Sequence, residues 1–446
     1  MDQGKLDELK NLLSGEVILP ADAGYEGLRG SFVRVGSPAI IVRCKDKADV
    51  AAAIRFAHDQ GLALSVRSGG HSMSGLSTND GGLVIDLSYF NAVEVLDASR
   101  NLVRIGAGAR WGEAAQALAE HGLAISSGDT NTVGVGGLTL GGGIGWMVRK
   151  HGLSIDSLEA AEVVLADGRV VRVSESAHPE LFWAIRGGGG NFGVVTSFDF
   201  RAQPVGNVFG GMVMYGIAEM EQVLRRWAAY MRTAPEELSS TLVIFPGFGT
   251  QPPPMVMVLL CYAGDDDALS EQVIQPLREL GTPLNQAIEK KPYYKMLEDA
   301  NPPPGLKSAA QNGFVKALDG DVIQALVANF GQPGTPIVQL RSLGGAMARV
   351  SEESTAFAHR NYEAFLLSAA LVPLSTSVEE TERIRRESWL PLQPFVAGAY
   401  VNFLTDVGET SIAASYPAAT YARLAAIKAE FDPENIFNQN ANIKPA

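Results

Sequence analysis

The fold of this chain is decided by two stretches: Arg67-Ser68-Gly69-Gly70-His71 and Val133-Gly134-Val135-Gly136-Gly137-Leu138-Thr139-Leu140-Gly141-Gly142-Gly143. The first is a short glycine turn that ends in a histidine and follows a predicted buried strand at 61–66. Glycines in such a turn adopt positive φ and bring bare N–H groups close to a phosphate. The second stretch is uncharged, and seven of the twelve residues from 134 to 145 are glycine. A packed helix or strand avoids that composition on entropic grounds, so we expect a wall without side chains.

Together, the two stretches are typical of a binding site for a dinucleotide that carries a flat ring. Bare N–H groups suit the pyrophosphate, and a wall without side chains suits the ring. The pattern matches neither GxGxxG nor GxxxxGK(S/T), so a Rossmann fold and a P-loop are not supported. Taken alone, Ser-Gly-Gly-His also fits an ordinary hairpin or crossover turn. The glycine tract is too short and too rich in glycine to span a membrane.

Composition limits the class of protein. The chain has 446 residues, of which 19% are charged and 46% hydrophobic, as expected for a globular protein with a large core. Its net charge of −13 and its lack of a basic patch argue against nucleic acid as a partner. Cys44 and Cys261 are too few for a disulfide framework, and the polar N-terminus lacks the apolar core of a signal peptide. We therefore expect a cytoplasmic protein without a membrane partner, and a homo-oligomer is compatible with the sequence.

Hydrophobic patterning predicts an α+β fold rather than a regular βαβ repeat. In the first half, helices are expected at 49–60 and 111–121 and a hairpin at 158–165 and 170–173. After residue 206, amphipathic helices at 217–233 and 265–281 accompany candidate strands at 240–245, 255–262, 313–317, 336–340 and 398–404. Tyr293-Tyr294 and residues 302–305 are expected in long loops that line a pocket.

Further motifs reveal a resemblance to a known family. These occur in the family's order over residues 20–200 and 399–446, and besides the two glycine stretches they include residues 79–87, 149–153, 181–196, 421–424 and 428–437. On these residues the chain resembles the FAD-linked oxidases, and more narrowly the berberine bridge enzyme-like members of the vanillyl-alcohol oxidase superfamily. The resemblance implies a two-domain fold of vanillyl-alcohol-oxidase type. Its FAD-binding domain comprises 1–205 and 405–446, and 206–404 form an antiparallel-sheet substrate domain covered by helices.

The resemblance assigns a role to the histidine of the first stretch. In the family, this histidine attacks the flavin 8α position and stays covalently attached, which here implies His71. A free histidine that hydrogen-bonds near the flavin is the alternative. Many relatives have a second bond from a cysteine at the position of Thr130, so a single link is expected in this chain. The remaining histidines show no metal-ligand spacing, and no metal is expected.

Further contacts with FAD are implied by the same motifs. Backbone groups are expected to dominate around the pyrophosphate and ribityl chain, because they satisfy a diphosphate without lysines. The residues expected at the cofactor are Arg67, Ser68, Gly69, Gly70, Ser72, Thr130, Val133, Gly136, Gly137, Gly141, Val195, Asn440 and Asn442. For the two asparagines, an ordinary surface position is an equally good interpretation.

Residues 399–403 resemble the family's catalytic strand. On a strand, Tyr400 and Asn402 share a face, and the family places this tyrosine over the flavin as base or substrate anchor. A tyrosine base at neutral pH needs a lowered pKa, and a hydrogen-bonded core tyrosine is the alternative. Several relatives have Glu or Gln some thirty to forty residues earlier, where a rough alignment places Ser368. Val133 resembles the family's oxygen gate, and simple packing would explain it equally well.

The function implied is an oxidase that takes hydride from a CH–OH or CH–NH carbon and reduces O2 to H2O2. Thr130 and the hydrophobic second domain favour a small, largely apolar amine or secondary alcohol over a sugar. A dehydrogenase with another acceptor is one alternative. A flavoprotein that supports a non-redox cyclisation or ligand binding is another.

Overall fold

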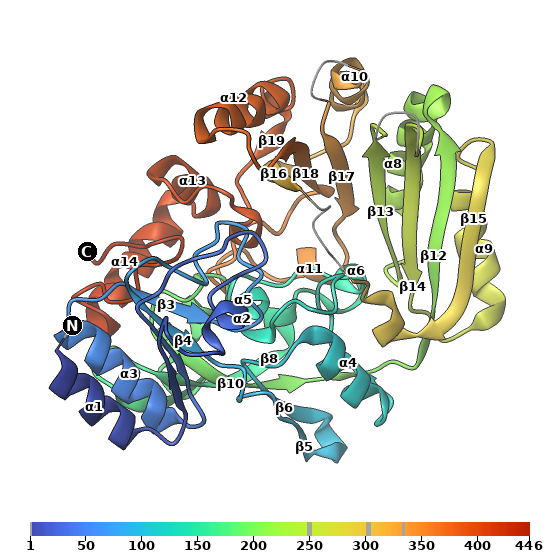
Figure 1. The fold of residues 1–446 in the computed structure, drawn as a ribbon. Coiled ribbons are helices and arrows are strands. Elements are labelled where there is room, and N and C mark those ends of the chain that lie inside the picture. The colour runs from blue at the N-terminus through green and yellow to red at the C-terminus, as the bar shows by residue number, and fades with distance from the viewer. Residues whose placement is uncertain (1, 248–251, 300–304, 332–334) are drawn as a thin grey trace.

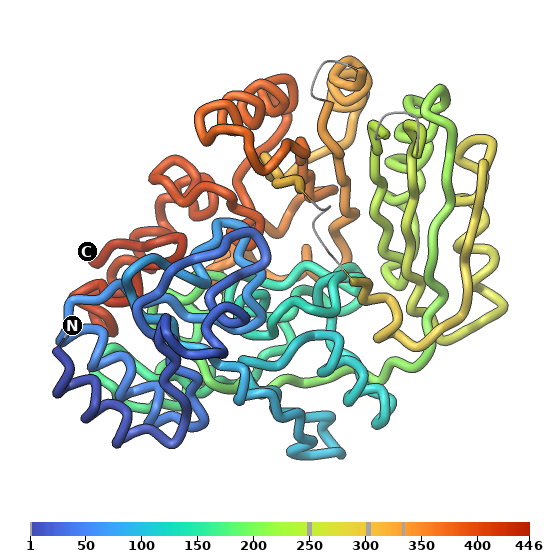
Figure 2. The backbone as a smooth tube through the Cα atoms, in the orientation of Figure 1, coloured from blue at the N-terminus to red at the C-terminus, as the bar shows by residue number. Residues whose placement is uncertain are grey.

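The computed structural model describes residues 2–247, 252–299, 305–331 and 335–446 (Figures 1 and 2). The N-terminal part begins with a four-stranded sheet in the order β1-β2-β4-β3, in which β2, β4 and β3 are parallel. Helix α3 (Lys47–Asp59) connects β2 to β3. The strands are β1 Glu16–Ile18, β2 Ile40–Arg43, β3 Leu64–Arg67 and β4 Leu83–Asp86.

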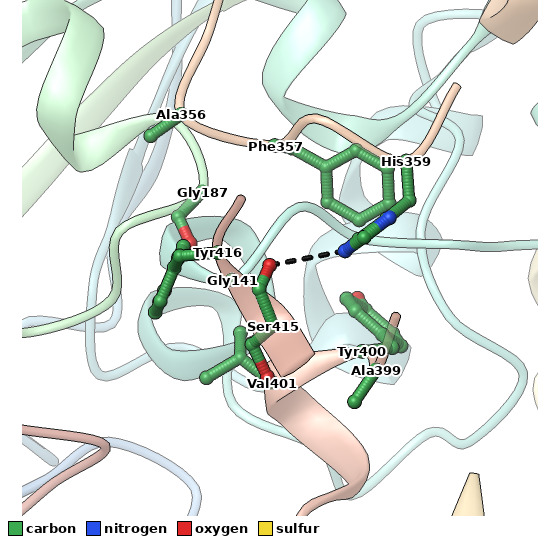
Figure 3. A pocket seen from close by; sticks show the side chains of 10 residues that line it. All are labelled: Gly141, Gly187, Ala356, Phe357, His359, Ala399, Tyr400, Val401, Ser415 and Tyr416. Carbon is green, nitrogen blue, oxygen red and sulfur yellow. Dashed lines mark hydrogen bonds between the residues drawn. The ribbon is translucent and has the colours of Figure 1, made fainter. Parts of the chain in front are cut away.

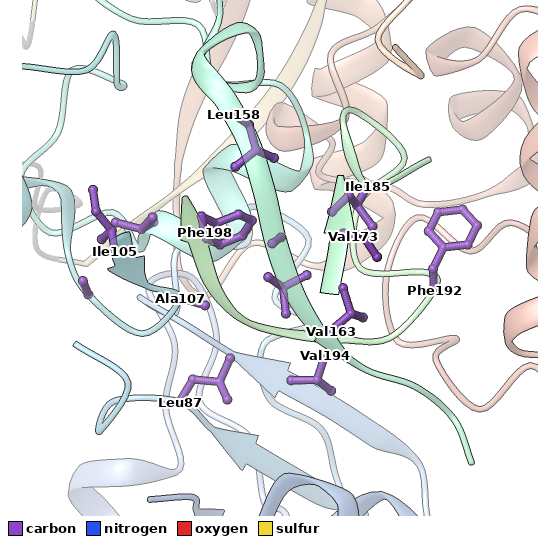
Figure 4. Packing of buried hydrophobic residues seen from close by; sticks show 14 of the residues in the cluster. Leu87, Ile105, Ala107, Leu158, Val163, Val173, Ile185, Phe192, Val194 and Phe198 are labelled. Carbon is purple, nitrogen blue, oxygen red and sulfur yellow. The ribbon is translucent and has the colours of Figure 1, made fainter. Parts of the chain in front are cut away.

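A second, five-stranded antiparallel sheet has the order β5-β6-β10-β8-β9. Its strands are β5 Val93–Asp97, β6 Leu102–Gly106, β8 Leu158–Val164, β9 Val170–Ser174 and β10 Val194–Arg201. β8 and β9 form the predicted hairpin, and α4 (Trp111–Ala119) confirms the second predicted helix. Both faces of the central strand β10 are buried, and Figure 4 shows Val194 and Phe198 packed among residues of β8, β9 and α7 (Pro179–Ile185).

The second part of the chain forms one eight-stranded antiparallel sheet in the order β15-β12-β14-β13-β17-β18-β16-β19 (Figure 1). Its strands are β12 Asn207–Gly216, β13 Leu238–Phe245, β14 Met255–Tyr262, β15 Pro283–Pro292, β16 Leu306–Val315, β17 Ile337–Ser342, β18 Ala364–Pro373 and β19 Val396–Ala397. The amphipathic helices bury their apolar stripes on one face of this sheet, as Trp227 and Leu277 do. These helices are α8 Met220–Thr233, α9 Asp267–Arg278, α10 Gly320–Asn329 and α12 Val378–Trp389.

The C-terminal segment returns to the first part of the chain. It contains α13 (Glu409–Ser415) and α14 (Ala418–Phe431). Arg423 of α14 pairs with Glu180 at 2.7 Å, and the buried Lys428 donates to the carbonyl of Asn191 at 2.6 Å. The separate sheets and this return are in keeping with the predicted α+β fold, while the domain limits 205 and 404 stay a prediction. No helix in the described part of the chain is long and apolar enough to cross a membrane.

Two local predictions were wrong. Residues 398–404 are not a strand: β19 ends at Ala397, Gly398 has a φ of +65°, and a 3₁₀ turn follows at Val401–Phe403. The N–H of Tyr400 donates to the Asn312 side chain at 2.7 Å, where a strand would pair with backbone. The glycine tract, expected to avoid packed structure, contains the short helix α5 (Val135–Leu140).

Of the two loops predicted to line a pocket, only the one at Tyr293-Tyr294 lies fully within the described part of the chain. Residues 293–296 form a 3₁₀ turn, and Tyr293 is buried rather than exposed to a pocket. Residues 302–304 lie outside the described part of the chain.

Candidate active site

The two glycine stretches meet backbone against backbone. A Cβ added to Gly69 would lie 2.2 Å from the nitrogen of Gly134, and a Cβ on Gly134 would lie 2.1 Å from the nitrogen of Gly69. The Ser68 hydroxyl fixes the same crossing, because it donates to the Ala107 carbonyl at 2.6 Å and accepts from the Gly136 N–H at 3.3 Å. The structure therefore joins in one place the two stretches on which the sequence prediction depends.

His71 lies at the end of this turn in a half-buried position. Gly70 adopts a φ of +73°, which glycine tolerates without strain, and thereby turns the chain into His71. The imidazole stacks on Phe32 with ring centroids 4.4 Å apart. Burial, and to a smaller extent the charge of Arg110, lower the pKa of His71. Its ring is therefore neutral at neutral pH and retains the nitrogen lone pair that a nucleophile needs.

Arg67 is held by protein groups. Its Nε pairs with Asp86 at 2.7 Å, and its Nη1 donates to the carbonyls of Leu28 and Gly30. These bonds tie the end of β3 to the N-terminal loop and so position the glycine turn. Nη2 is buried without a hydrogen-bond partner among the described residues, and a contact of Arg67 with the cofactor stays a prediction.

The other residues predicted to contact the cofactor differ in how exposed they are. Gly137 is exposed in α5, whereas the face of Gly141 is covered by Asn402, whose Oδ1 lies 2.1 Å from where a Cβ would stand. Val195 is buried in β10 and belongs to the main core. Asn440 donates to the Gly190 carbonyl at 3.2 Å, so it is tied to the motif at 181–196 and is not an ordinary surface residue.

Several buried polar atoms lack a partner within the described residues. The oxygens concerned are Thr132 Oγ1, Thr139 Oγ1, Asn440 Oδ1 and Asn442 Oδ1. Buried polar groups in folded proteins are nearly always hydrogen-bonded, so such atoms point to an additional polar partner. Together with the glycine backbone at 69–70 and 136–137, they fit a large polar dinucleotide. Among the described residues, no cluster of side chains could hold a metal ion.

Tyr400 is buried and anchors the glycine tract. Its hydroxyl accepts hydrogen bonds from the N–H groups of Gly143 at 2.8 Å and Ile144 at 3.3 Å, and from the Asn402 amide at 2.9 Å. Although these two residues lie on a turn and not on the predicted strand, their side chains do meet. Burial raises the pKa of Tyr400, and the three donors offset only part of that effect. A role as base stays untested, and the surroundings favour a role in positioning the tract.

A small cavity, with room for about one water molecule, lies beside Tyr400 (Figure 3). Phe357, Val401, Tyr416 and several small residues line it, and the ring of His359 donates to the Ser415 carbonyl at 3.1 Å. This cavity is smaller than most ligand pockets and is mainly apolar. The hydroxyl of Tyr416, another lining residue, donates to the Gly187 carbonyl at 3.2 Å.

The face of the large sheet not covered by helices carries the side chains that sequence reasoning missed. On β17, Val338 and Leu340 belong to the core under the helices, so the alternate residues Gln339 and Arg341 point to the other face. Arg341 pairs with Asp129 at 2.7 Å, next to Thr130. The alternation in residues 337–342 was visible in the sequence, but which face is open follows only from the strand register.

Ser368, which the rough alignment places at the position of a glutamate or glutamine in relatives, lies on β18. On β18, Phe365 and Leu367 belong to the same hydrophobic cluster as Tyr400, whereas Leu366 belongs to the core under the helices. Ser368 alternates with Leu367 and therefore points to the helix-covered face. Its neighbours Leu367 and Ala369 do point to the open face, and neither carries a carboxylate.

Segment 129–131 lies between the glycine tract and the open face of the large sheet. The Asn131 N–H donates to the Glu298 carbonyl at 3.0 Å, and the Glu298 N–H donates to the Asp129 carbonyl at the same distance. Thr130 is half-buried within this pairing, with its hydroxyl on Asp129 at 3.1 Å. The glycine tract begins two residues later, so the open sheet face and the tract border the same region.

Comparison with known proteins agrees with this geometry. A model of an FAD binding domain matches residues 38–174, and a berberine and berberine-like model matches residues 399–444. An FAD-linked oxidoreductase of Dictyostelium discoideum is 32% identical over 419 residues, which cover 92% of this chain and 90% of that protein. (R)-6-hydroxynicotine oxidase of Paenarthrobacter nicotinovorans is 30% identical over 455 residues, which cover 97% of both.

Solved structures extend the likeness to the whole fold. The structure of 6-hydroxy-D-nicotine oxidase from Arthrobacter nicotinovorans matches with a TM-score of 0.87 at 29% identity and covers 97% of this chain and 98% of that one. A glucooligosaccharide oxidase from Acremonium strictum, whose FAD is described as 6-S-cysteinyl, 8α-N1-histidyl, matches with a TM-score of 0.86 at 26% identity and covers 98% and 99%.

A fold of this type, with an FAD-binding domain and a large antiparallel sheet, defines an FAD-dependent oxidoreductase. The chain belongs to the berberine bridge enzyme-like group of FAD-linked oxidases.

Proposed function

We propose that this protein oxidises a small, largely apolar molecule at a CH–NH or CH–OH carbon and reduces O2 to H2O2. One observation carries the proposal: aliphatic and thioether side chains dominate the open face of the sheet across β12, β14 and β13. These residues are Met212, Met214, Met257, Leu259 and Val243. A sugar would leave its hydroxyl groups without partners on such a wall, whereas an apolar substrate loses nothing there.

FAD, when bound, supplies the hydride acceptor and transfers the electrons onward. Backbone N–H groups of Gly69, Gly70 and Gly137 would hold its pyrophosphate, as bare amides do in anion-binding loops. The N–H of Gly136 already donates to Ala107 and Ser68, so Gly136 would contribute only a surface without a side chain. His71 would hold the flavin covalently through the 8α position. Its lowered pKa supports this assignment, since the attacking nitrogen has to be unprotonated.

The proposed link is a single one. The doubly linked relative bears a cysteinyl bond, whereas the family resemblance places the half-buried Thr130 at the cysteine position in this chain. Cys44 and Cys261 are both buried as free thiols in the hydrophobic core, far in sequence from the glycine stretches.

The protein's own groups would mainly bind and orient. Tyr400 holds the end of the glycine tract by accepting hydrogen bonds from Gly143 and Ile144, and Asn402 donates to the Leu138 carbonyl at 3.0 Å. Because burial raises its pKa, Tyr400 keeps its proton at neutral pH and orients the tract as a neutral phenol. Val133, at the start of the tract, is half-buried and small enough to leave a path for O2. A cytoplasmic location stays a prediction.

Anaerobic mixing with candidate amines and secondary alcohols tests the function. Bleaching of the visible flavin band followed by H2O2 on aeration is the result expected. Bleaching without H2O2 would identify a dehydrogenase with another acceptor. Binding without bleaching across a panel that includes substrates of the relatives would favour the non-redox role.

A further inference from the structure

Arg341 has a donor that no group in the described part of the chain uses. Its side chain is 12% exposed, and both of its recorded polar contacts involve Nη2: the carboxylate of Asp129 at 2.7 Å and Oε1 of Gln339 at 3.2 Å. Nε is buried without a hydrogen-bond partner among the described residues. A guanidinium presents five N–H donors in a planar fork that matches a carboxylate. The Nε–H group is therefore a donor without an acceptor among the described residues.

Beyond its contacts with Asp129 and Gln339 and its neighbour Thr241, Arg341 borders apolar side chains on the open face. The strand register places Thr241 opposite Arg341, Leu259 beyond Thr241, and Met212 beyond Leu259. On the other side, Phe365 of β18 lies opposite Arg341, and the Phe403 ring lies 5.2 Å from the guanidinium carbon. A molecule that covers this row meets one cation at the end of an aliphatic wall.

Asp129 keeps this cation paired within the protein. It comes from the segment that precedes the glycine tract, and its side chain is 37% exposed, so it is the more solvated partner. A buried guanidinium without a counter-ion is strongly disfavoured. A carboxylate in this position neutralises Arg341 and also competes with any anion that approaches it.

We propose that Arg341 recognises a carboxylate group on an otherwise apolar substrate. The carboxylate would take the Nε edge of the guanidinium, while the apolar body would lie along the row of Thr241, Leu259 and Met212. The proposal rests on the proposed function, because it names the substrate class of the same site. It differs from that function in depending on one charged side chain and not on the redox reaction.

Equilibrium binding to the FAD-loaded protein tests the proposal without turnover. The probes are phenylacetate and phenylacetamide, which share an apolar ring and differ in charge. Their dissociation constants are measured from the perturbation of the flavin absorption band and from the shift of the thermal midpoint. We expect phenylacetate to bind at least about tenfold more tightly, as charge-assisted bidentate hydrogen bonds are stronger than neutral ones. Equal affinities, or tighter binding of the amide, would overturn the proposal.

Variants identify the residue responsible. Arg341→Gln should abolish the preference for the acid, and Arg341→Lys should retain part of it. Arg349→Gln removes an exposed arginine that pairs with Glu236 outside this face and should leave the preference unchanged. Asp129→Asn should tighten phenylacetate by about three- to tenfold and leave phenylacetamide unaffected, because it removes the competing carboxylate. A purely structural ion pair would instead weaken both probes in both variants.

Two results distinguish this proposal from others. If Arg341→Gln shifts the flavin spectrum of the ligand-free protein and weakens both probes equally, Arg341 serves the cofactor and the proposal is wrong. If the acid preference is found but no H2O2 is produced with any substrate, carboxylate recognition stands and the oxidase function fails.

Discussion

Gly69 and Gly134 lie so close that neither position has room for a side chain. The nitrogen of each would stand about 2.1–2.2 Å from a Cβ added to the other, well inside van der Waals contact. The two residues are 65 positions apart in the chain and belong to the two stretches that indicate a dinucleotide site. Their contact fixes how the histidine turn is oriented relative to the glycine tract.

Gly134→Ala should therefore destabilise the protein, and Gly137→Ala should not. The methyl group added at position 134 would force two backbones apart, at a penalty of about 1–3 kcal/mol or more. At Gly137 a Cβ meets no atom within 4 Å, and alanine in a helix gains roughly 0.5–1 kcal/mol over glycine. Urea unfolding measures both effects. Equal stability of the two variants would contradict the close packing of Gly134.

The same pair of variants tests cofactor binding. If the pyrophosphate lies against the backbone at Gly137, the methyl group of Gly137→Ala would enter the space that it occupies, so the variant should fold normally but purify with less FAD per chain. The flavin-to-protein absorbance ratio gives this content directly. Full FAD content in Gly137→Ala would place the pyrophosphate elsewhere along the tract.

His71 is expected to hold the flavin by a single covalent bond. Acid-precipitated protein should stay yellow, and digestion should yield one flavin peptide that contains His71. His71→Ala should bind FAD loosely or not at all, because its ring supplies the only proposed link. A colourless precipitate from the unmodified protein would argue against the link, and a flavin peptide that also spans residues 123–150 would argue against its being single.

Much of the fold was predictable because it depends on local patterns. The amphipathic stripes of α8 and α9 and the hairpin of β8 and β9 follow from periodicity within a short window. The glycine helix α5 did not, because backbone packing against distant segments overrides the low helix propensity of glycine.

The site was predictable only where the family motifs carry it. Ser68 and Gly69 meet the glycine tract as expected, but Arg341 and Asp129 come together through the strand register and a pairing between segments far apart in the chain. No local pattern encodes that register. For Tyr400 and Asn402, the predicted strand was wrong but the predicted proximity was right. Their side chains meet because a turn brings them together.

Tyr400→Phe should reduce stability more than it slows the reaction. The change leaves the N–H groups of Gly143 and Ile144 and the Asn402 amide without their acceptor, and each unsatisfied buried donor costs about 1–3 kcal/mol. Since burial raises the pKa of Tyr400, its hydroxyl is protonated at neutral pH and is a poor base there. We expect flavin reduction to slow by less than about tenfold in stopped flow. A slowing of roughly 10²–10⁴-fold with unchanged stability would restore the role of base.

His151 should make the fold sensitive to acid. Burial and the neighbouring charge of Lys150 lower its pKa to about 4, compared with 6.5 for the unperturbed group. Below pH 6.5 the unfolded chain binds a proton at His151 that the folded chain does not, so stability falls as pH decreases towards 4. His151 lowers the free energy of unfolding by at most about 1.4 kcal/mol for each pH unit of acidification. Above the pKa of 6.5 in the unfolded chain, it no longer makes the free energy of unfolding depend on pH.

His151→Gln is the variant that isolates this effect. Its unfolding free energy should vary less between pH 7 and pH 4.5 than that of the unmodified protein. His121→Gln removes an exposed histidine and is the matched control. An identical pH dependence for His151→Gln and the unmodified protein would show that His151 titrates normally in the folded state.

Val133→Leu tests whether the first residue of the tract controls access of oxygen. Val133 is half-buried, and its carbonyl accepts the Trp111 N–H at 2.9 Å, so its backbone is fixed while its side chain borders the tract. One added methylene should cost at most about 1–3 kcal/mol and leave the fold intact. Reoxidation of dithionite-reduced enzyme should slow at least about tenfold, an amount that corresponds to about 1.4 kcal/mol in the barrier. Anaerobic reduction by substrate should stay near the original rate, whereas general damage to the site would slow both half-reactions. Slow reoxidation of the unmodified enzyme itself would favour a dehydrogenase with another electron acceptor.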